Sequence, residues 1–358
     1  MTDTGKNSPE DGELQRKYSN TLEKARGGDP AAALEAGRLL FEGVGVKRNR
    51  GEAAKWFETG FRAYRKLAQD GDAGALFALA ACYDDGTGVF RDDRKATDLY
   101  RQAAEKGDAR AAFRLGTRYE FGLGAPRDAA AALVWYRAGA EGGDPDACRA
   151  VALASAGDPA QAVFWHRKAA DGGNGLSALD LARALLKGEG CGRDIPGAVA
   201  CFEKAYDLGV SAAAADLGLF YYRGEGEYAD DKLAAFWLAR AVESEQTDAF
   251  LPFADLLTAG RGVARNRKRA LRLIHEAALD GDAPAQFELG RIFHEGLGVS
   301  PDREKAVRWW KESAYNGFAP ARGRLAELGF AEADWSDPDE LYDDDGELFS
   351  DGEQDCAP

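Results

Sequence analysis

A Gly-x-Gly sequence that returns at a nearly fixed interval constrains this chain more than any other feature. It occurs seven times, and its first glycines are separated by 43, 36, 66, 36, 36 and 36 residues. Periods of roughly 20–50 residues are typical of proteins built from stacked supersecondary units. We therefore expect an array of repeats. The glycine pairs are Gly43/Gly45, Gly86/Gly88, Gly122/Gly124, Gly188/Gly190, Gly224/Gly226, Gly260/Gly262 and Gly296/Gly298.

A bulky residue follows each glycine pair in register. Eleven residues after the second glycine the chain has Trp56, Leu99, Trp135, Cys201, Trp237, Leu273 or Trp309. Trp165 marks an eighth unit that lacks Gly-x-Gly, and it lies 30 residues after Trp135, which accounts for the interval of 66. We expect these side chains to pack between adjacent units, because the alanines around them let the helix backbones approach.

Each unit is predicted to form two helices. The first carries an L-G-x-x-Y pattern, as in Leu115-Gly116 and Tyr119, whose leucine and tyrosine share one helix face. The glycine beside the leucine allows a neighbouring helix to come close. The first glycine of each Gly-x-Gly suits the left-handed position that ends a helix. An Asp or Asn after the loop, such as Asp92 or Asp302, is predicted to cap the next helix.

The L-G-x-x-Y…G-x-G and A-x-x-W-Y-x-x-A-A…G-D patterns resemble Sel1-like repeats (SLRs), which are relatives of the tetratricopeptide repeat. The resemblance implies an all-α fold, an α/α superhelical solenoid of about eight helix-turn-helix units with terminal capping helices. We expect a disordered N-terminus at 1–12, a capping helix at 13–28, the solenoid at 29–328 and an acidic disordered tail at 329–358. The expected units are 29–72, 73–108, 109–144, 145–174, 175–210, 211–246, 247–282 and 283–317, with a cap at 318–328.

Two departures from the regular repeat predict local changes in structure. The first unit has seven extra residues after Trp56. Seven residues make about two helical turns, so this helix can lengthen without rotating its buried face. Pro252 falls inside the first helix of the seventh unit, where we expect a kink or a late start.

Few residues in this chain are suited to catalysis or metal binding. The three histidines, His166, His275 and His294, form no H-E-x-x-H and no Cys/His pair at ligand spacing; we expect His166 to pack in the core. A cysteine-rich branch of the SLR family carries a disulfide in each repeat and is linked to β-lactam binding or hydrolysis. Here only Cys191 and Cys201 share a unit, so that activity is not carried over. We expect no enzyme activity, no cofactor and no metal.

Charge is concentrated at one end of the chain. Residues 331–358 contain 12 Asp or Glu and no Lys or Arg, which leaves 49 acidic and 46 basic residues in 1–330. A nearly neutral body argues against nucleic-acid binding. The sequence has no run of 18 apolar residues, no signal-like N-terminus and no CxxC, so we expect a cytoplasmic protein that does not bind membranes. We expect a monomer with a protein or peptide partner.

The resemblance implies an adaptor that binds its partner on the concave wall formed by the first helices. Cations are predicted on that wall at Arg183, Lys187, Arg223 and Arg291, where they would bind an acidic peptide or be ordinary surface charge. Basic residues also recur on the loops between the helices, at Lys47, Arg48, Arg50, Arg91, Arg127, Arg193 and the run Arg265, Arg267, Lys268 and Arg269. They form either a solvated edge or a surface that attracts an acidic partner or the protein's own tail.

The acidic tail contains apolar residues at intervals. Trp335, Leu341, Tyr342, Leu348 and Phe349 alternate with Asp and Glu. One interpretation is a disordered tail that keeps the protein in solution. The other is a short motif that mimics nucleic acid or folds back on the basic edge, and this gives an alternative function as a regulator that acts through its tail.

Overall fold

The computed structural model describes residues 9–224 and 228–332, and every regular element within them is a helix. The chain divides into two compact units, Met1–Ala198 and Val199–Pro358, and α11 (Ile195–Asp207) spans the division. The first unit contains α1 (Pro9–Arg26), α2 (Pro30–Glu42), α3 (Arg50–Gln69), α4 (Ala73–Asp85), α5 (Asp93–Glu105), α6 (Ala109–Phe121), α7 (Ala129–Glu141), α8 (Pro145–Ala154), α9 (Pro159–Asp171) and α10 (Gly175–Lys187). The second contains α12 (Ala212–Arg223), α13 (Asp231–Glu243), the short η2 (Thr247–Ala249), α14 (Phe250–Ala259), α15 (Arg267–Leu279), α16 (Ala283–Glu295), α17 (Arg303–Tyr315) and α18 (Ala319–Glu327).

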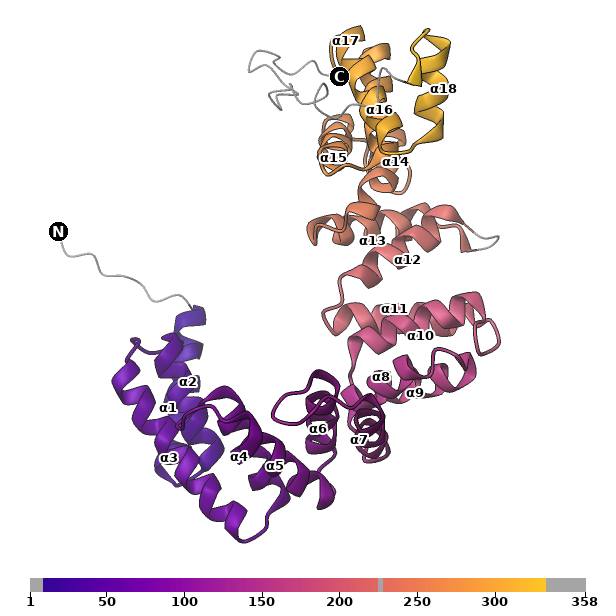
Figure 1. Ribbon diagram of the computed structural model, residues 1–358. Helices are drawn as coiled ribbons and strands as arrows, with labels where there is room; N and C mark the ends of the chain where they lie inside the picture. Colours follow the sequence, from indigo (N-terminus) through magenta and orange to yellow (C-terminus); the bar gives the residue numbers. More distant parts are fainter. Residues whose placement is uncertain (1–8, 225–227, 333–358) are drawn as a thin grey trace, which may run out of the picture. The chain divides into compact units, whose positions relative to one another are not determined.

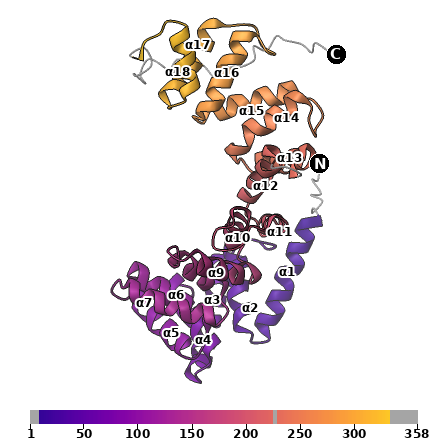
Figure 2. The ribbon, with the colours of Figure 1, turned by 90° about the vertical axis from the view of Figure 1, so that its right-hand side faces the viewer.

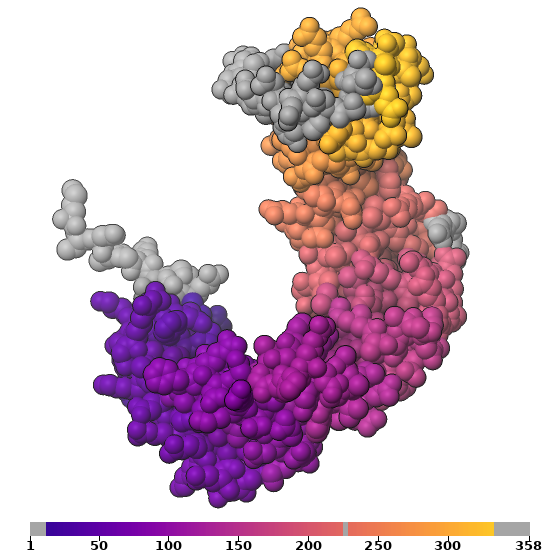
Figure 3. All heavy atoms as spheres, viewed as in Figure 1, coloured from indigo at the N-terminus to yellow at the C-terminus, as the bar shows by residue number. Residues whose placement is uncertain are grey.

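The helices form helix-turn-helix pairs that follow one another along each unit, as the two ribbon views show (Figures 1 and 2). Within each unit the surface colour changes gradually from one pair to the next (Figure 3). This arrangement is that of a solenoid, in which each repeat contacts only its sequence neighbours. The predicted all-α solenoid with terminal helices is confirmed.

The helix ends follow the predicted capping pattern. The Asp108 carboxylate accepts a hydrogen bond from the Ala111 backbone N–H at 3.0 Å, at the start of α6. The same helix ends at Gly122, whose φ of 73° lies in the left-handed region that glycine tolerates. Asp92 and Asp302 cap α5 and α17 in the same way, as predicted.

In the third and eighth pairs, the two helices approach at the glycine of the L-G-x-x-Y pattern. A Cβ atom placed on Gly116 of α6 would lie 2.6 Å from the Tyr136 ring of α7. Gly290 of α16 faces the Trp310 ring of α17 at the same distance. Here the absence of a side chain lets a buried aromatic ring lie against the backbone. The glycine was predicted to allow this approach, but the sequence did not reveal which residue would fill the space.

The tryptophans one residue earlier pack against the preceding pair. Trp135 contacts the buried cluster that contains Tyr100 and Leu115, and the Trp237 ring meets the Tyr206 ring edge-on at 5.4 Å. The predicted packing of these side chains between neighbouring repeats is therefore confirmed. The two adjacent bulky residues therefore have different contacts. The second packs within its own helix pair, and the first packs against the preceding pair.

Both predicted irregularities are present. α3 has 20 residues where the other second helices have 13, which is the expected extension of seven. Phe61, in its added part, is buried against α4 in a cluster with Leu79 and Cys82. α14 begins late, at Phe250 after the η2 turn, so that Pro252 lies in its first turn and displaces no interior hydrogen bond.

Candidate functional site

The predicted wall begins with two cations on α10. Arg183 and Lys187 are both exposed and lie one helical turn apart. They occupy the positions nine and thirteen residues after the capping Asn174. The Lys187 ammonium lies 3.6 Å from the Glu189 carboxylate, and both side chains are well exposed, so this ion pair leaves the charges open to solvent.

On each of the two preceding first helices, one of these two positions carries an exposed apolar side chain. Phe121, thirteen residues after Asp108 on α6, is 66% exposed, and Leu153, nine residues after Asp144 on α8, is 53% exposed. α6 and α8 contact each other directly. Equivalent positions of stacked repeats face the same way. The consecutive first helices α6, α8 and α10 therefore present Phe121, Leu153, Arg183 and Lys187 as one row, which we call the wall row.

The other two predicted cations lie in the second unit. Arg223 is the last residue of α12 and is exposed. Arg291 of α16 donates to Glu288 and, at 2.9 Å, to Glu295. The hydrogen bond to Glu288 raises the pKa of Arg291. On α14, in the repeat between them, Asp255 occupies the position that Arg291 has on α16. An acidic residue thus lies in the repeat between those of Arg223 and Arg291. Arg291 itself forms ion pairs with two residues of its own helix.

The loop arginines have a structural use that the sequence did not reveal. Arg127 donates from Nε to the backbone carbonyl of Glu120 at 3.0 Å, near the end of α6. Carbonyls in the last helical turn have no partner within the helix. The same bond joins Arg48 to Phe41, Arg193 to Leu186 and Arg265 to Thr258. Four arginines of the predicted basic edge therefore donate to backbone carbonyls near helix ends.

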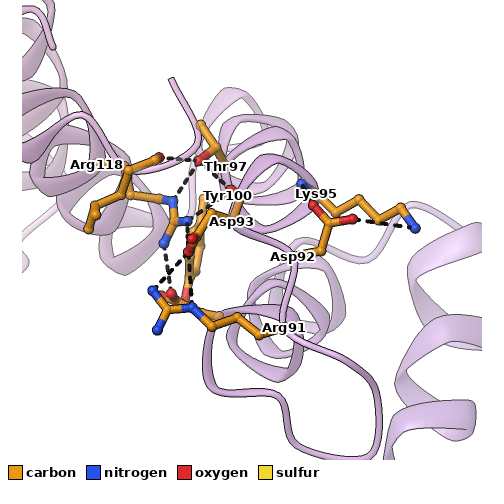
Figure 4. A network of polar contacts seen from close by, with 9 residues as sticks. Arg91, Asp92, Asp93, Lys95, Thr97, Tyr100 and Arg118 are labelled. Atoms are coloured by element: carbon orange, nitrogen blue, oxygen red, sulfur yellow. Dashed lines mark hydrogen bonds and ion pairs between the residues drawn. The ribbon is translucent and has the colours of Figure 1, made fainter. Parts of the chain in front are cut away.

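One arginine is buried between the second and third pairs. Arg118 of α6 is 2% exposed. Its guanidinium donates to the Thr97 hydroxyl at 2.6 Å, to the Asp84 carboxylate at 2.8 Å, and to the Asp93 carbonyl and carboxylate at 2.8 and 3.0 Å. Figure 4 shows it pointing to Thr97 and Asp93, with Arg91 approaching the same carboxylate. Arg91, and then Arg118, hold the pKa of Asp93 below its ordinary value.

The repeat register shows what Arg118 replaces. Arg118 lies four residues before the first glycine of its loop, and the same position holds Leu39 in the first repeat, Leu256 in the seventh and Ile292 in the eighth, all of which are buried. Thr97 likewise stands where the seventh repeat has Leu271. The sequence signal for this network was a polar residue at each of two facing repeat positions that are apolar in other repeats. These residues are Arg118 and Thr97. The network joins two repeats and is too buried to bind a partner.

A serine, a histidine and an aspartate meet between α9 and α10. His166 Nδ1 lies 3.3 Å from the Ser177 hydroxyl and 4.0 Å from the Asp180 carboxylate. A hydrolase relay needs the serine and the aspartate on different ring nitrogens. Here both approach Nδ1, and Ser177 is fully buried. Burial lowers the pKa of His166, which favours the neutral ring. The predicted packing role of this histidine is confirmed.

The described thiols are poorly suited to nucleophilic chemistry. Burial raises the pKa of Cys82 to about 11 and also raises that of Cys148, which disfavours the reactive thiolate. Cys191 and Cys201 form no disulfide. Within residues 9–224 and 228–332, no group of three or more His, Cys, Asp or Glu is placed to hold a metal ion. None of the helices in these ranges is long and apolar enough to span a membrane.

The predicted tail motif lies outside the described residues. This applies to Trp335, Leu341, Tyr342, Leu348 and Phe349.

Comparisons with known proteins agree with this architecture. A family model described as "Sel1 repeat" matches eight segments, residues 30–61, 73–108, 109–144, 154–174, 175–210, 211–245, 254–282 and 283–318. A solved protective antigen of uropathogenic Escherichia coli with an SLR fold is 26% identical, with a TM-score of 0.64 and coverage of 91% of this chain and 78% of that one. A Sel1 repeat protein from Oxalobacter formigenes is 27% identical, with a TM-score of 0.54 and coverage of 92% and 97%. No curated protein sequence matches the chain.

Proposed function

Because the chain belongs to the Sel1 repeat family, we propose that it is a non-catalytic adaptor that binds a segment of another protein on its first helices. Stacked repeats create extended surfaces of this kind. We further propose that it acts as a cytoplasmic monomer. The cysteines of the described residues, which form no disulfide, support a reducing compartment.

The wall row is the observation that carries this proposal. Phe121 and Leu153 expose large apolar side chains, and Arg183 and Lys187 follow them in the same register. Burial of apolar surface is the dominant favourable contribution in most protein association, while hydrogen bonds to arginine give orientation and specificity. A segment with one or two apolar residues followed by a carboxylate would satisfy both parts of the row.

Three observations support a role without catalysis. The Ser177 hydroxyl is buried and shares one histidine nitrogen with Asp180. Burial disfavours the Cys82 thiolate. The most connected charged network, around Arg118, holds two repeats together. None of these arrangements offers a nucleophile to a substrate. The alternative of a regulator acting through its tail depends on residues 333–358, which lie outside the described residues.

Charge reversal on α10 tests the proposal. The full chain, its Arg183→Glu/Lys187→Glu variant and a control variant are used to capture proteins from the cells that make it. The control is Arg137→Glu/Arg167→Glu, which makes the same charge change at exposed positions of second helices. We expect at least one protein to be captured by the wild type and the control and lost by the wall variant.

A second variant separates the apolar part of the wall row from its charge. Phe121→Ser/Leu153→Ser changes two exposed residues and should leave helicity intact, as circular dichroism will show. It should weaken binding of the same protein. If both wall variants capture the same proteins as the wild type, the row is not the binding surface and the proposal is wrong.

A further inference from the structure

A cavity of about 220 Å³ lies between the seventh and eighth repeats. Its walls come from α15 and α16 and from the loop that follows α16. Most of the lining is apolar, and its polar side chains are Thr258, Arg267, Glu288 and Arg291. The apolar part consists of Ala270, Leu271, Ile274, Ile292 and Leu297.

The cavity occupies a position that is filled elsewhere in the chain. Between the second and third repeats, the register positions of Ile292 and Leu271 hold Arg118 and Thr97, whose side chains bond to each other. The loop glycine there, Gly124, lies directly on the backbone of the preceding repeat. The corresponding Gly298 has no atom within 4 Å of where a Cβ would stand. The last loop therefore stands away from its neighbour and leaves the space open.

The loop also differs from its counterparts in sequence. Its residue 301 is proline, in the position where four other loops have the arginine that bonds to a helix carbonyl. Proline has no side-chain donor and a fixed φ. The open space thus lies beside a loop that differs in sequence at this position.

The approach to the cavity is basic. Residues 260–275 contain six Lys or Arg and no Asp or Glu. Arg261 is paired with Asp231 and Asp255, and Arg265 holds the end of α14. Arg267 is exposed and lines the cavity. Arg291 lines it too, with its charge balanced by Glu288 and Glu295. An occupant with an apolar centre and acidic flanks would match both the walls and the approach.

We propose that this cavity binds the Leu348–Phe349 pair of the chain's own C-terminal segment. The pair is flanked by Glu347 on one side and Asp351 on the other, and residues 333–358 contain 11 acidic and no basic residues. A cavity of about 150 Å³ is enough for a benzene-sized ring, so the larger space here can take the Phe349 ring. Tyr342, the other tail aromatic of similar size, would bring a hydroxyl into apolar walls.

The segment can reach the cavity. The described chain ends at Glu332, after α18, and α18 packs on α17, α17 on α16 and α16 on α15. Helices pack about 8–10 Å apart, so three such steps span about 30 Å. The 16 residues from Glu332 to Leu348 can extend to about 55 Å. The tail therefore competes for the cavity at an effective concentration on the order of 1 mM.

A labelled peptide of residues 343–353 tests this occupancy, because it contains the Leu348–Phe349 pair and no other apolar pair. Its affinity is measured for the full chain and for the full-length Leu348→Ala/Phe349→Ala variant, whose own tail can no longer compete. If the peptide binds with a Kd of about 100 µM, an effective concentration of about 1 mM predicts roughly tenfold tighter binding to the variant. The control Leu341→Ala/Tyr342→Ala should bind the peptide as weakly as the wild type does.

A second pair of variants locates the peptide. In the Leu348→Ala/Phe349→Ala background, Arg267→Glu should weaken peptide binding about fivefold. Arg303→Glu makes the same change one repeat later and away from the cavity, and it should have little effect.

Three results would overturn the proposal. The peptide fails to bind the tail variant, or it binds the wild type and the tail variant equally, or a peptide with both apolar residues changed to alanine binds as well. The last outcome would mean that the basic stretch attracts any acidic segment. None of these results bears on the wall row, which lies in the other unit.

Discussion

Replacing Arg118 by alanine is the change whose cost follows most directly from the structure. The variant loses two hydrogen bonds to buried groups, the Thr97 hydroxyl and the Asp93 carbonyl. Each such bond contributes about 1 kcal/mol. The Asp84 and Asp93 carboxylates are about one-third exposed and regain water. A further loss of about 1 kcal/mol comes from the space left by the side chain. We expect a total of about 3 kcal/mol.

Hydrogen exchange measured by mass spectrometry reports this loss where it occurs. The free energy of opening should fall in peptides that cover α5 and α6 and stay unchanged in peptides that cover α16 and α17, because repeats contact only their neighbours. Arg114→Ala is the control, since Arg114 lies one turn earlier on the same helix and is exposed. Its effect should stay below about 0.5 kcal/mol.

A double variant tests the reasoning itself. Thr97→Ala/Arg118→Leu installs the apolar pair that the sixth and seventh repeats have at Ala235 and Leu256. Replacing a buried charged network by apolar residues of suitable size is often neutral, so the double variant should lose no more than about 1 kcal/mol. If it is as unstable as Arg118→Ala, or if Arg118→Ala itself costs less than about 1 kcal/mol, Arg118 does not simply fill an apolar position.

Two further predictions concern packing and pH. Gly290→Ala should lower the free energy of unfolding by about 1–3 kcal/mol, because its Cβ would press on the Trp310 ring. Gly323→Ala, in open space on α18, should be neutral or stabilising. Equal effects of the two substitutions would contradict the packing described here. Burial lowers the pKa of His166, so below about pH 6.5 the unfolded chain binds a proton that the folded protein does not, and stability falls. The wild type should therefore lose more unfolding free energy than His166→Phe between about pH 7.5 and 5.5, and parallel curves would show that His166 does not carry this dependence.

The sequence by itself determined the repeat, its two helices and their ends. These depend on local chemistry, since Gly122 can adopt a left-handed conformation and Asp108 can cap a helix whatever lies nearby. The same holds for the added turns of α3 and the late start at Phe250. The cations on α10 were also visible in the sequence, because the repeat register fixes which helix face they occupy.

Only the tertiary structure decided how the repeats fit together. Arg118 is an ordinary surface residue type, and it became a buried link because Thr97 and Asp84 arrive from another repeat. Arg127 was predicted as part of a charged edge, but a helix carbonyl lies within its reach. The cavity beside Ile292 exists because one loop stands away from its neighbour. Each of these depends on distances between segments that are separate in the chain, which no local pattern encodes.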